Sequence, residues 1–205
     1  APNLTPVTLE LGGKSPAVVA ADYPVERAAA RLATGKWFNC GQTCIAPDYV
    51  LIDAGRRDAL VDALRSEVQA RYGATLDGSR DYTRVVNDGQ YRRLRGYLDQ
   101  ARAAGCTVLE LAAVDPAQAE AGRLLPPTVV LDPPDDLDLM QEEIFGPILP
   151  IRGYARLDEA LETVARRDRP LALYPFSHDR DTVERIIGST LAGGITVNDT
   201  LLHFA

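Results

Sequence analysis

The sequence predicts an α/β fold, a single domain over residues 1–205 in which helices cover both faces of a mainly parallel sheet to give three layers. Short apolar runs alternate with amphipathic helical stretches along the whole chain. The composition, 46% hydrophobic and 25% charged, is that of a globular domain. No internal repeat, low-complexity tract or linker divides the sequence. Because a parallel sheet is buried on both faces, helices are expected on each side of it.

Strands are expected where short apolar runs are bounded by glycine, proline or polar residues. The predicted strands are 7–11, 17–21, 49–52, 106–111, 124–131, 146–151, 171–177 and 194–198. Proline has no backbone N–H to donate to a neighbouring strand. The proline-containing runs at 124–131 and 146–151 are therefore expected at sheet edges or at strand starts.

Helices are expected where apolar residues recur at intervals of three and four. Pro24 is typical of a helix start, and Leu60, Leu64 and Val68 share one face of a helix that Gly73 ends. The predicted helices are 24–38, 56–73, 90–104, 156–167 and 180–190.

Charge and cysteine content exclude several classes of protein. The net charge is −7 and the basic residues do not cluster, which argues against a nucleic-acid or anionic-membrane surface. No apolar run approaches the roughly 18 residues of a membrane span. Three cysteines favour a reducing compartment over a disulfide framework, so we expect a cytoplasmic protein. The chain opens without methionine and close to an apolar run, so an excised piece of a longer polypeptide is expected.

The first candidate motif is LELGGKSP, residues 9–16. Its Gly-Lys-Ser suggests a phosphate-binding P-loop, but Thr8 stands where that loop needs its first glycine, so the P-loop is excluded. Glu10 remains, at the end of the predicted strand 7–11. Functional side chains project from strand ends in α/β sheets. The alternative is a solvent-facing carboxylate, which is the usual state of glutamate.

The second motif is KWFNCGQTC, residues 36–44, with Cys40 and Cys44 four apart. A zinc site would need four ligands, and only Cys106 and two distant histidines could supply the others. The spacing also differs from a C-x-x-C redox pair. Cys44 is then either a nucleophile or a small core residue. In the first case, exposed backbone N–H groups would favour its thiolate form. The spacing does not decide between these two interpretations.

The third motif is QEEIFGPILPI, residues 141–151. Glu142 and Glu143 precede Phe145 and a Gly-Pro break. Considered alone, this stretch is typical of a helix end, with the aromatic ring in the core and both carboxylates in solvent.

Together, in this order, ELGGKSP, FNCGQTC and EEIFGP resemble the catalytic domain of the aldehyde dehydrogenase superfamily. The resemblance covers essentially the whole chain. GQTCIAPDYVL, RPLALYPFS and GGITVNDTLLH are similar to the class 3 branch and, within it, to bacterial coniferyl aldehyde dehydrogenases.

The resemblance implies a role for each motif. Cys44 would be the nucleophile that forms a thiohemiacetal and then a thioester with the aldehyde. Glu10 would be the base that activates water for thioester hydrolysis. Glu143 would bind the nicotinamide ribose, Phe145 would pack near the nicotinamide, and the main chain at Leu11 would touch the nicotinamide amide. The Cys44 N–H would help to hold the oxyanion.

The resemblance also implies partners. The cofactor would be NAD or NADP, bound mainly by a domain that lies upstream of residue 1, and no metal is implied. The substrate would be an aldehyde of the aromatic, coniferyl-aldehyde type, and the full-length protein would be a homodimer. Residues 1–205 alone are expected to be inactive in hydride transfer. The rivals are a cysteine-dependent hydrolase that uses His178 or His203 and an inert folded fragment.

Overall fold

A computed structural model of the protein describes residues 4, 6–9 and 11–202. Within these residues, seven strands form one sheet in the order β3-β4-β5-β2-β1-β6-β7. Only the β3–β4 pair is antiparallel among the strand pairs of the described chain. The strands are β1 (Pro16–Val19), β2 (Tyr49–Asp53), β3 (Thr107–Glu110), β4 (Thr128–Leu131), β5 (Ile148–Tyr154), β6 (Ala172–Phe176) and β7 (Gly194–Ile195).

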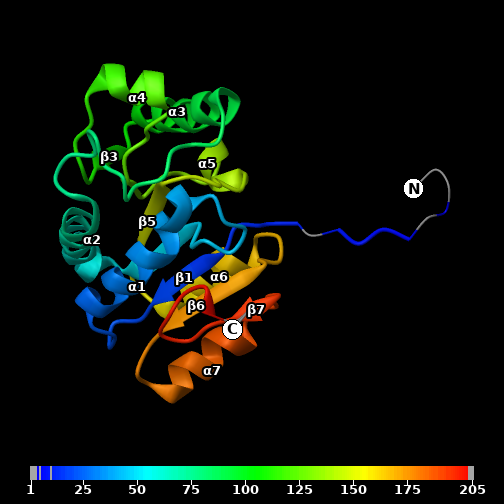
Figure 1. Cartoon of the computed structure of the whole chain (residues 1–205). Helices are drawn as coiled ribbons and strands as arrows, with labels where there is room; N and C mark the ends of the chain where they lie inside the picture. Colours follow the sequence, from blue (N-terminus) through cyan, green and yellow to red (C-terminus); the bar gives the residue numbers. More distant parts are fainter. Residues whose placement is uncertain (1–3, 5, 10, 203–205) are drawn as a thin grey trace.

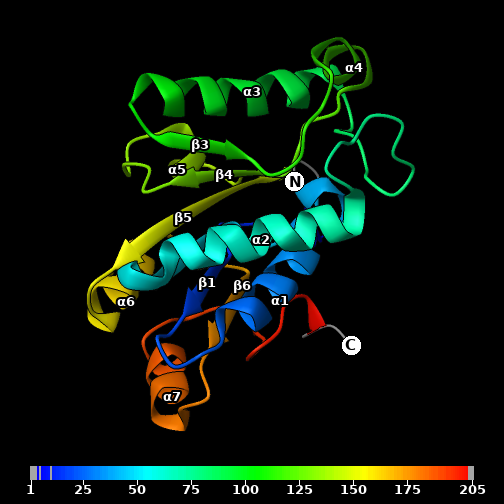
Figure 2. The same cartoon turned by 90° about the vertical axis from the view of Figure 1, so that its left-hand side faces the viewer.

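The helices cover both faces of this sheet. The chain moves from β1 through α1 to β2 in one direction across the sheet and from β5 through α6 to β6 in the other. Crossovers between parallel strands are right-handed, so opposite directions place α1 and α6 on opposite faces. Figures 1 and 2 show α1 and α2 together on one face and α6 on the other. The predicted three-layer α/β fold with a mainly parallel sheet is therefore confirmed.

The helix ends follow local sequence signals. Asn87 begins α3 by accepting a hydrogen bond from the Gln90 N–H at 2.9 Å. Gly105, with φ +78°, ends the same helix. The helices are α1 (Val25–Trp37), α2 (Arg57–Tyr72), α3 (Asp88–Ala103), α4 (Pro116–Gly122), α5 (Asp138–Gln141), α6 (Leu157–Ala165) and α7 (Arg180–Gly188), with 3₁₀ turns η1 (Phe38–Gly41) and η2 (Ala54–Arg56).

Two predictions about strands were wrong. The described residues of the predicted strand 7–11 form no strand, and Val7, Leu9 and Leu11 are largely exposed. An apolar run becomes a strand only when another strand pairs with it, and none of the described residues does so here. The run at 146–151 was expected at an edge or a strand start, yet β5 lies inside the sheet with Pro150 in its interior. The sheet accepts this proline because β5 pairs with β2 only from Ile151 onward.

The three motifs meet at one edge of the sheet. Residues 12–15 precede β1, residues 44–48 precede β2 and residues 141–147 precede β5. β1, β2 and β5 run parallel, so their amino ends lie together. We call this the amino edge. The sequence had suggested the opposite geometry for Glu10, at the end of a strand, and Glu10 itself lies outside the described residues.

Candidate active site

The turn before Cys44 has an unusual backbone. Asn39, Cys40 and Gly41 have φ values of 51°, 57° and 70°. Left-handed backbone is costly for residues other than glycine, so the surrounding structure must hold it. Gln42 supplies much of that support through its side chain: Nε2 donates to the Arg84 carbonyl at 3.1 Å, and Oε1 accepts from the Val86 N–H at 2.9 Å.

Cys44 follows this turn and is partly exposed, at the amino edge of β2. The turn continues with a hydrogen bond from the Ala46 N–H to the Thr43 carbonyl at 2.9 Å. Beneath it, the hydroxyl of Tyr174 on β6 donates to the Ile45 carbonyl. The nucleophile predicted from the sequence is thus accessible, on a loop that a core tyrosine holds in place.

Cys40 differs from Cys44 although only three residues separate them. Its side chain is fully buried, and its sulfur lies 3.6 Å from the Tyr82 hydroxyl. Burial raises the pKa of the Cys40 thiol to about 12, so the reactive thiolate form is disfavoured. Cys40 is therefore a small core residue.

The cysteine turn packs directly against the third motif. A methyl group built on Gly41 would overlap the Gly146 carbonyl oxygen, so the two backbones touch. The indole N–H of Trp37 donates to the Pro147 carbonyl at 3.0 Å, in the buried interior. Residues about one hundred positions apart are thereby fixed against each other.

Glu143 is half-buried and lies against the first motif. Its carboxylate occupies the space that a side chain at Gly12 would need, and it accepts a hydrogen bond from the Gly13 backbone. Burial raises the pKa of Glu143, and the Gly13 hydrogen bond opposes that rise. The structure thus brings Glu143 to the glycine pair that follows Glu10 and Leu11 in the sequence.

Phe145 and Leu11, the other described residues predicted for the site, are exposed to solvent. Phe145 is 39% exposed with φ 47°, and the core position beside it belongs to Ile144, which is fully buried. The expectation of an aromatic anchor in the core is therefore wrong for Phe145. The Leu11 side chain is 68% exposed.

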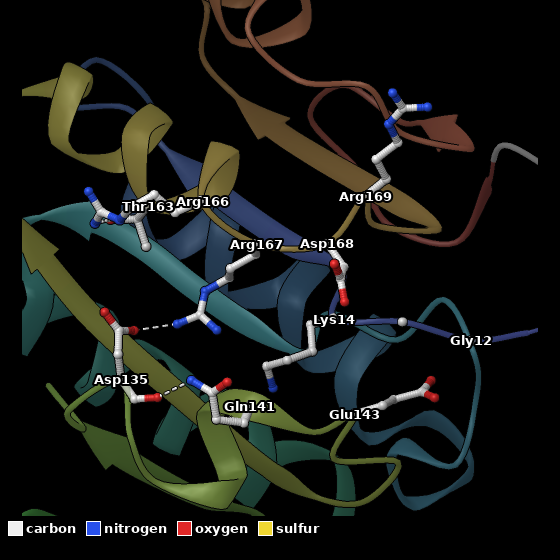
Figure 3. A pocket seen from close by; sticks show the side chains of 11 residues that line it. Gly12, Lys14, Asp135, Gln141, Glu143, Thr163, Arg166, Arg167, Asp168 and Arg169 are labelled. Atoms are coloured by element: carbon white, nitrogen blue, oxygen red, sulfur yellow. Dashed lines mark hydrogen bonds and ion pairs between the residues drawn. The ribbon is translucent and has the colours of Figure 1, made fainter.

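A cleft of about 610 Å³ opens beside Glu143 (Figure 3). Gly12, Lys14 and Glu143 line one part of it, and Gln141 and Arg167 line another. Because residue 12 is glycine, no side chain covers the backbone beside the Glu143 carboxylate. That carboxylate accepts one hydrogen bond from Gly13 and has further lone pairs available. Such a wall suits a ligand that offers hydroxyl groups, so these residues fit the ribose of a nicotinamide cofactor.

Two charged residues that the sequence did not single out connect the motifs. Lys14 forms an ion pair with Asp48, and their side chains are only 11% and 4% exposed. Lys14 had been considered only as part of the rejected P-loop, and Asp48 had not been considered individually. In the sequence, Lys14 lies four residues after Glu10, and Asp48 lies four residues after Cys44. This shared spacing is the one indication in the sequence that the two residues could meet, and it can be interpreted only once β1 and β2 are paired.

The rival hydrolase is not supported at this site. His178 follows β6 and packs against Tyr23 with the two rings tilted and their centroids 4.8 Å apart. It therefore lies at the carboxyl edge of the sheet, whereas Cys44 lies at the amino edge. His203 is outside the described residues.

The described residues do not gather three His, Cys, Asp or Glu side chains as a metal site would. No described helix is long and apolar enough to span a membrane.

Comparison with known proteins identifies the family. The family model described as "Aldehyde dehydrogenase family" matches residues 1–204. A probable coniferyl aldehyde dehydrogenase of Pseudomonas aeruginosa is 49% identical over 205 residues, covering 100% of this chain and 42% of that protein. Aldehyde dehydrogenase family 3 member A2 of Rattus norvegicus is 41% identical over 204 residues, covering 100% of this chain and 40% of the relative.

Solved structures agree. The substrate-bound state of Staphylococcus aureus AldH superposes with a TM-score of 0.90 at 41% identity, covering 99% of this chain and 43% of that one. The NADP-dependent glyceraldehyde-3-phosphate dehydrogenase of Bacillus halodurans, complexed with NADP, superposes with a TM-score of 0.81 at 28% identity. The match covers 94% of this chain and 39% of that chain. This chain thus spans about two fifths of the length of the proteins it matches. It belongs to the aldehyde dehydrogenase family.

Proposed function

We propose that this chain is the cysteine-bearing catalytic part of a longer aldehyde dehydrogenase that oxidises an aldehyde to the carboxylic acid with NAD or NADP. The support is the convergence at the amino edge. The Cys44 turn, the Gly12–Gly13 pair and Glu143 come from three distant stretches of the chain and meet there. A partly exposed thiol beside a half-buried carboxylate supports this proposal.

Cys44 carries the covalent chemistry in this proposal. Its thiolate adds to the aldehyde carbonyl carbon and gives a thiohemiacetal, whose oxyanion the Cys44 backbone N–H helps to hold. A bound nicotinamide cofactor supplies the acceptor for the hydride that leaves this carbon. Loss of the hydride gives a thioester on Cys44. Glu10 takes a proton from the water that hydrolyses the thioester, which releases the acid and restores the thiol.

Glu143 orients the cofactor and takes no part in the acyl chemistry. Its carboxylate accepts from the Gly13 backbone and keeps further lone pairs for the ribose hydroxyls. Phe145 lies two residues on, with its ring partly exposed, and is proposed to pack near the nicotinamide. The main chain at Leu11 is proposed to touch the nicotinamide amide.

The finer features of the function are also proposals. The likeness to a probable coniferyl aldehyde dehydrogenase favours an aromatic aldehyde as substrate. The chain holds no G-x-G-x-x-G motif, which supports a cofactor-binding domain outside residues 1–205. We propose that this domain lies upstream, that the full-length protein is a cytoplasmic homodimer, and that residues 1–205 alone do not transfer hydride.

Replacing Glu143 tests the assignment of roles. In the full-length polypeptide, Glu143→Gln should slow hydride transfer or weaken nucleotide binding, because a neutral amide is a poorer acceptor for ribose hydroxyls. Hydrolysis of a preformed Cys44 thioester should keep its rate. Stopped-flow measurement of nucleotide reduction, beside single-turnover deacylation, separates the two steps.

Glu142→Gln is the matched control for this test. Glu142 is the adjacent carboxylate, but its side chain accepts from the Tyr97 hydroxyl at 2.5 Å and does not line the cleft. It should leave nucleotide binding nearly unchanged. Slower deacylation with normal hydride transfer in Glu143→Gln would reverse the roles of Glu10 and Glu143.

A further inference from the structure

The Lys14 ammonium reaches three acceptors at the amino edge, beside the cleft. It pairs with the Asp48 carboxylate, and it donates to the Leu139 and Glu142 carbonyls, each at 2.8 Å. An ammonium group has three N–H donors, and these three contacts use all of them. Lys14 therefore joins the segment after the glycine pair to both ends of the stretch that leads to Glu143.

Asp48 is engaged just as fully. One carboxylate oxygen accepts from Lys14, and the other accepts from the Ile144 N–H at 2.9 Å. Its own backbone N–H donates to the Ser15 carbonyl at 2.7 Å. Asp48 lies four residues beyond Cys44, so these contacts anchor the end of the nucleophile loop to the other two motifs.

The two residues thus enclose Glu143. The peptide unit before it is held through the Glu142 carbonyl by Lys14, and the peptide unit after it is held through the Ile144 N–H by Asp48. We propose that Lys14 and Asp48 form a positioning pair that fixes the Glu143 carboxylate at the cleft and sets its placement relative to Cys44. This inference rests on the proposed function, because it takes Glu143 as the cofactor-binding carboxylate.

A buried ion pair suits this task better than neutral groups would. Hydrogen bonds from or to charged groups are shorter and stronger than neutral ones, and they weaken little with salt when water is excluded. Breaking one partner leaves an uncompensated charge in the interior. The pair therefore resists small displacements of residues 142–144, and an ångström-scale displacement of a binding group can cost catalysis dearly.

The expected consequence is selective. Loosening the pair should misplace Glu143 but leave the Cys44 thiol able to react, because the Cys44 loop keeps the Asp48 backbone bond to Ser15 and further support from Gln42 and Tyr174. Nucleotide binding should suffer while alkylation of Cys44 continues. If Lys14 and Asp48 served stability alone, their substitution would lower the melting temperature without a selective loss of nucleotide binding.

The experiment uses Asp48→Asn in the full-length polypeptide. The dissociation constant for NAD and for NADP is measured by titration, alkylation of Cys44 by iodoacetamide is timed, and amide exchange is followed in the peptide that covers residues 139–147. We expect weaker nucleotide binding on the order of tenfold, faster exchange in that peptide, and an alkylation rate within about twofold of the parent. Lys14→Arg keeps the charge but cannot place three donors at one point, so it should show the same pattern as a milder second variant.

Two controls sharpen the result. Asp132→Asn removes a carboxylate of the same kind, one that accepts the Gly153 N–H at 2.9 Å and pairs with Arg57, but at the carboxyl edge. It should keep nucleotide affinity. In the Glu143→Gln background, Asp48→Asn should weaken nucleotide affinity by less than about a further twofold. The carboxylate that Asp48 positions is already absent from that variant.

Full additivity of Asp48→Asn and Glu143→Gln would overturn the inference, as would unchanged nucleotide affinity in both Asp48→Asn and Lys14→Arg. Parent-like affinity in Glu143→Gln itself would instead contradict the proposed function. The two failures are therefore distinct.

Discussion

At the scale of single residues, burial decides which thiol in this chain can react. Cys40 and Cys44 share one turn, yet Cys40 is fully buried against Tyr82 while Cys44 is partly exposed. Desolvation penalises the thiolate of Cys40, and its pKa of about 12 keeps it protonated near neutral pH. The spacing of cysteines in the sequence could not make this distinction, because it depends on what packs around each sulfur.

Lys36 is a second residue whose surroundings the sequence conceals. It lies in the last turn of α1, completely buried, and within the described chain its ammonium has no hydrogen-bond partner. Burial lowers the pKa of Lys36 to about 8, although the charge of Asp48 opposes that shift. Lys14, Cys40 and Glu143 also act electrostatically on Lys36.

We predict that Lys36→Met stabilises the protein at neutral pH. Below pH 8 the lysine is charged in both folded and unfolded states, so the folded state bears the full cost of a buried charge. Between about pH 8 and 10.5 the unfolded state binds the proton and the folded state does not, so the stability of the parent rises. Chemical denaturation at pH 7 should favour the variant by about 3 kcal/mol, and this advantage should shrink by pH 10.

The control for this prediction is Arg92→Met, which removes an exposed cation from α3. It should change stability by less than about 0.5 kcal/mol at either pH. A Lys36→Met variant that is less stable than the parent at pH 7 would show that the ammonium makes a favourable interaction.

At the scale of elements, the left-handed turn over 39–41 is what presents Cys44. Helix α1 ends at Trp37, and the backbone then reverses through three residues with positive φ before β2 begins. Gly41 is the residue in this turn that touches Gly146 of the third motif. The turn therefore adds a direct backbone contact to the side-chain hydrogen bonds that couple the nucleophile loop to the Glu143 segment.

Gly41→Ala should break this coupling. Alanine at φ +70° costs roughly 1–2 kcal/mol in backbone strain, and its methyl group would also overlap the Gly146 carbonyl. Thermal unfolding should show a larger loss than in the matched variant Gly105→Ala, whose φ is +78° with open space around the new methyl group. Nucleotide reduction should fall in Gly41→Ala only. Equal losses in the two variants would mean that the Gly41–Gly146 contact is unimportant.

The elements most accurately predicted are those specified by local sequence. The helices at 56–73 and 90–104 combine an apolar face with a closing glycine, and they appear as α2 and α3 within two residues of the expected bounds. The short helices α4 and α5 were missed, although Asp115 and Pro116 form a local start signal for α4. The strand expected at 7–11 failed because strand formation depends on a partner, which no local pattern reveals.

At the scale of the whole molecule, the parallel register of β1, β2 and β5 assembles the site. It aligns Pro16 with Tyr49 and Val50 with Ile151, which brings the residues before each strand to one edge. The sequence motifs predicted Cys44 and Glu143 as site residues by resemblance. Lys14 and Asp48 could not be predicted, because an ion pair between residues 34 apart exists only once that register is formed.

Aldehyde oxidation is proposed to proceed through a covalent thioester on Cys44. The most direct measurement mixes the full-length polypeptide with a benzaldehyde-type substrate and NAD or NADP, quenches in acid and maps the acyl group by peptide fragmentation. Glu10→Gln is included so that slow deacylation accumulates the adduct. We predict an acyl group at the oxidation level of the acid on Cys44, one reduced nucleotide per adduct, no adduct in Cys44→Ser and an unchanged adduct in Cys40→Ser. An acyl group on Cys40 or Cys106, or turnover that persists in Cys44→Ser, would contradict the claim.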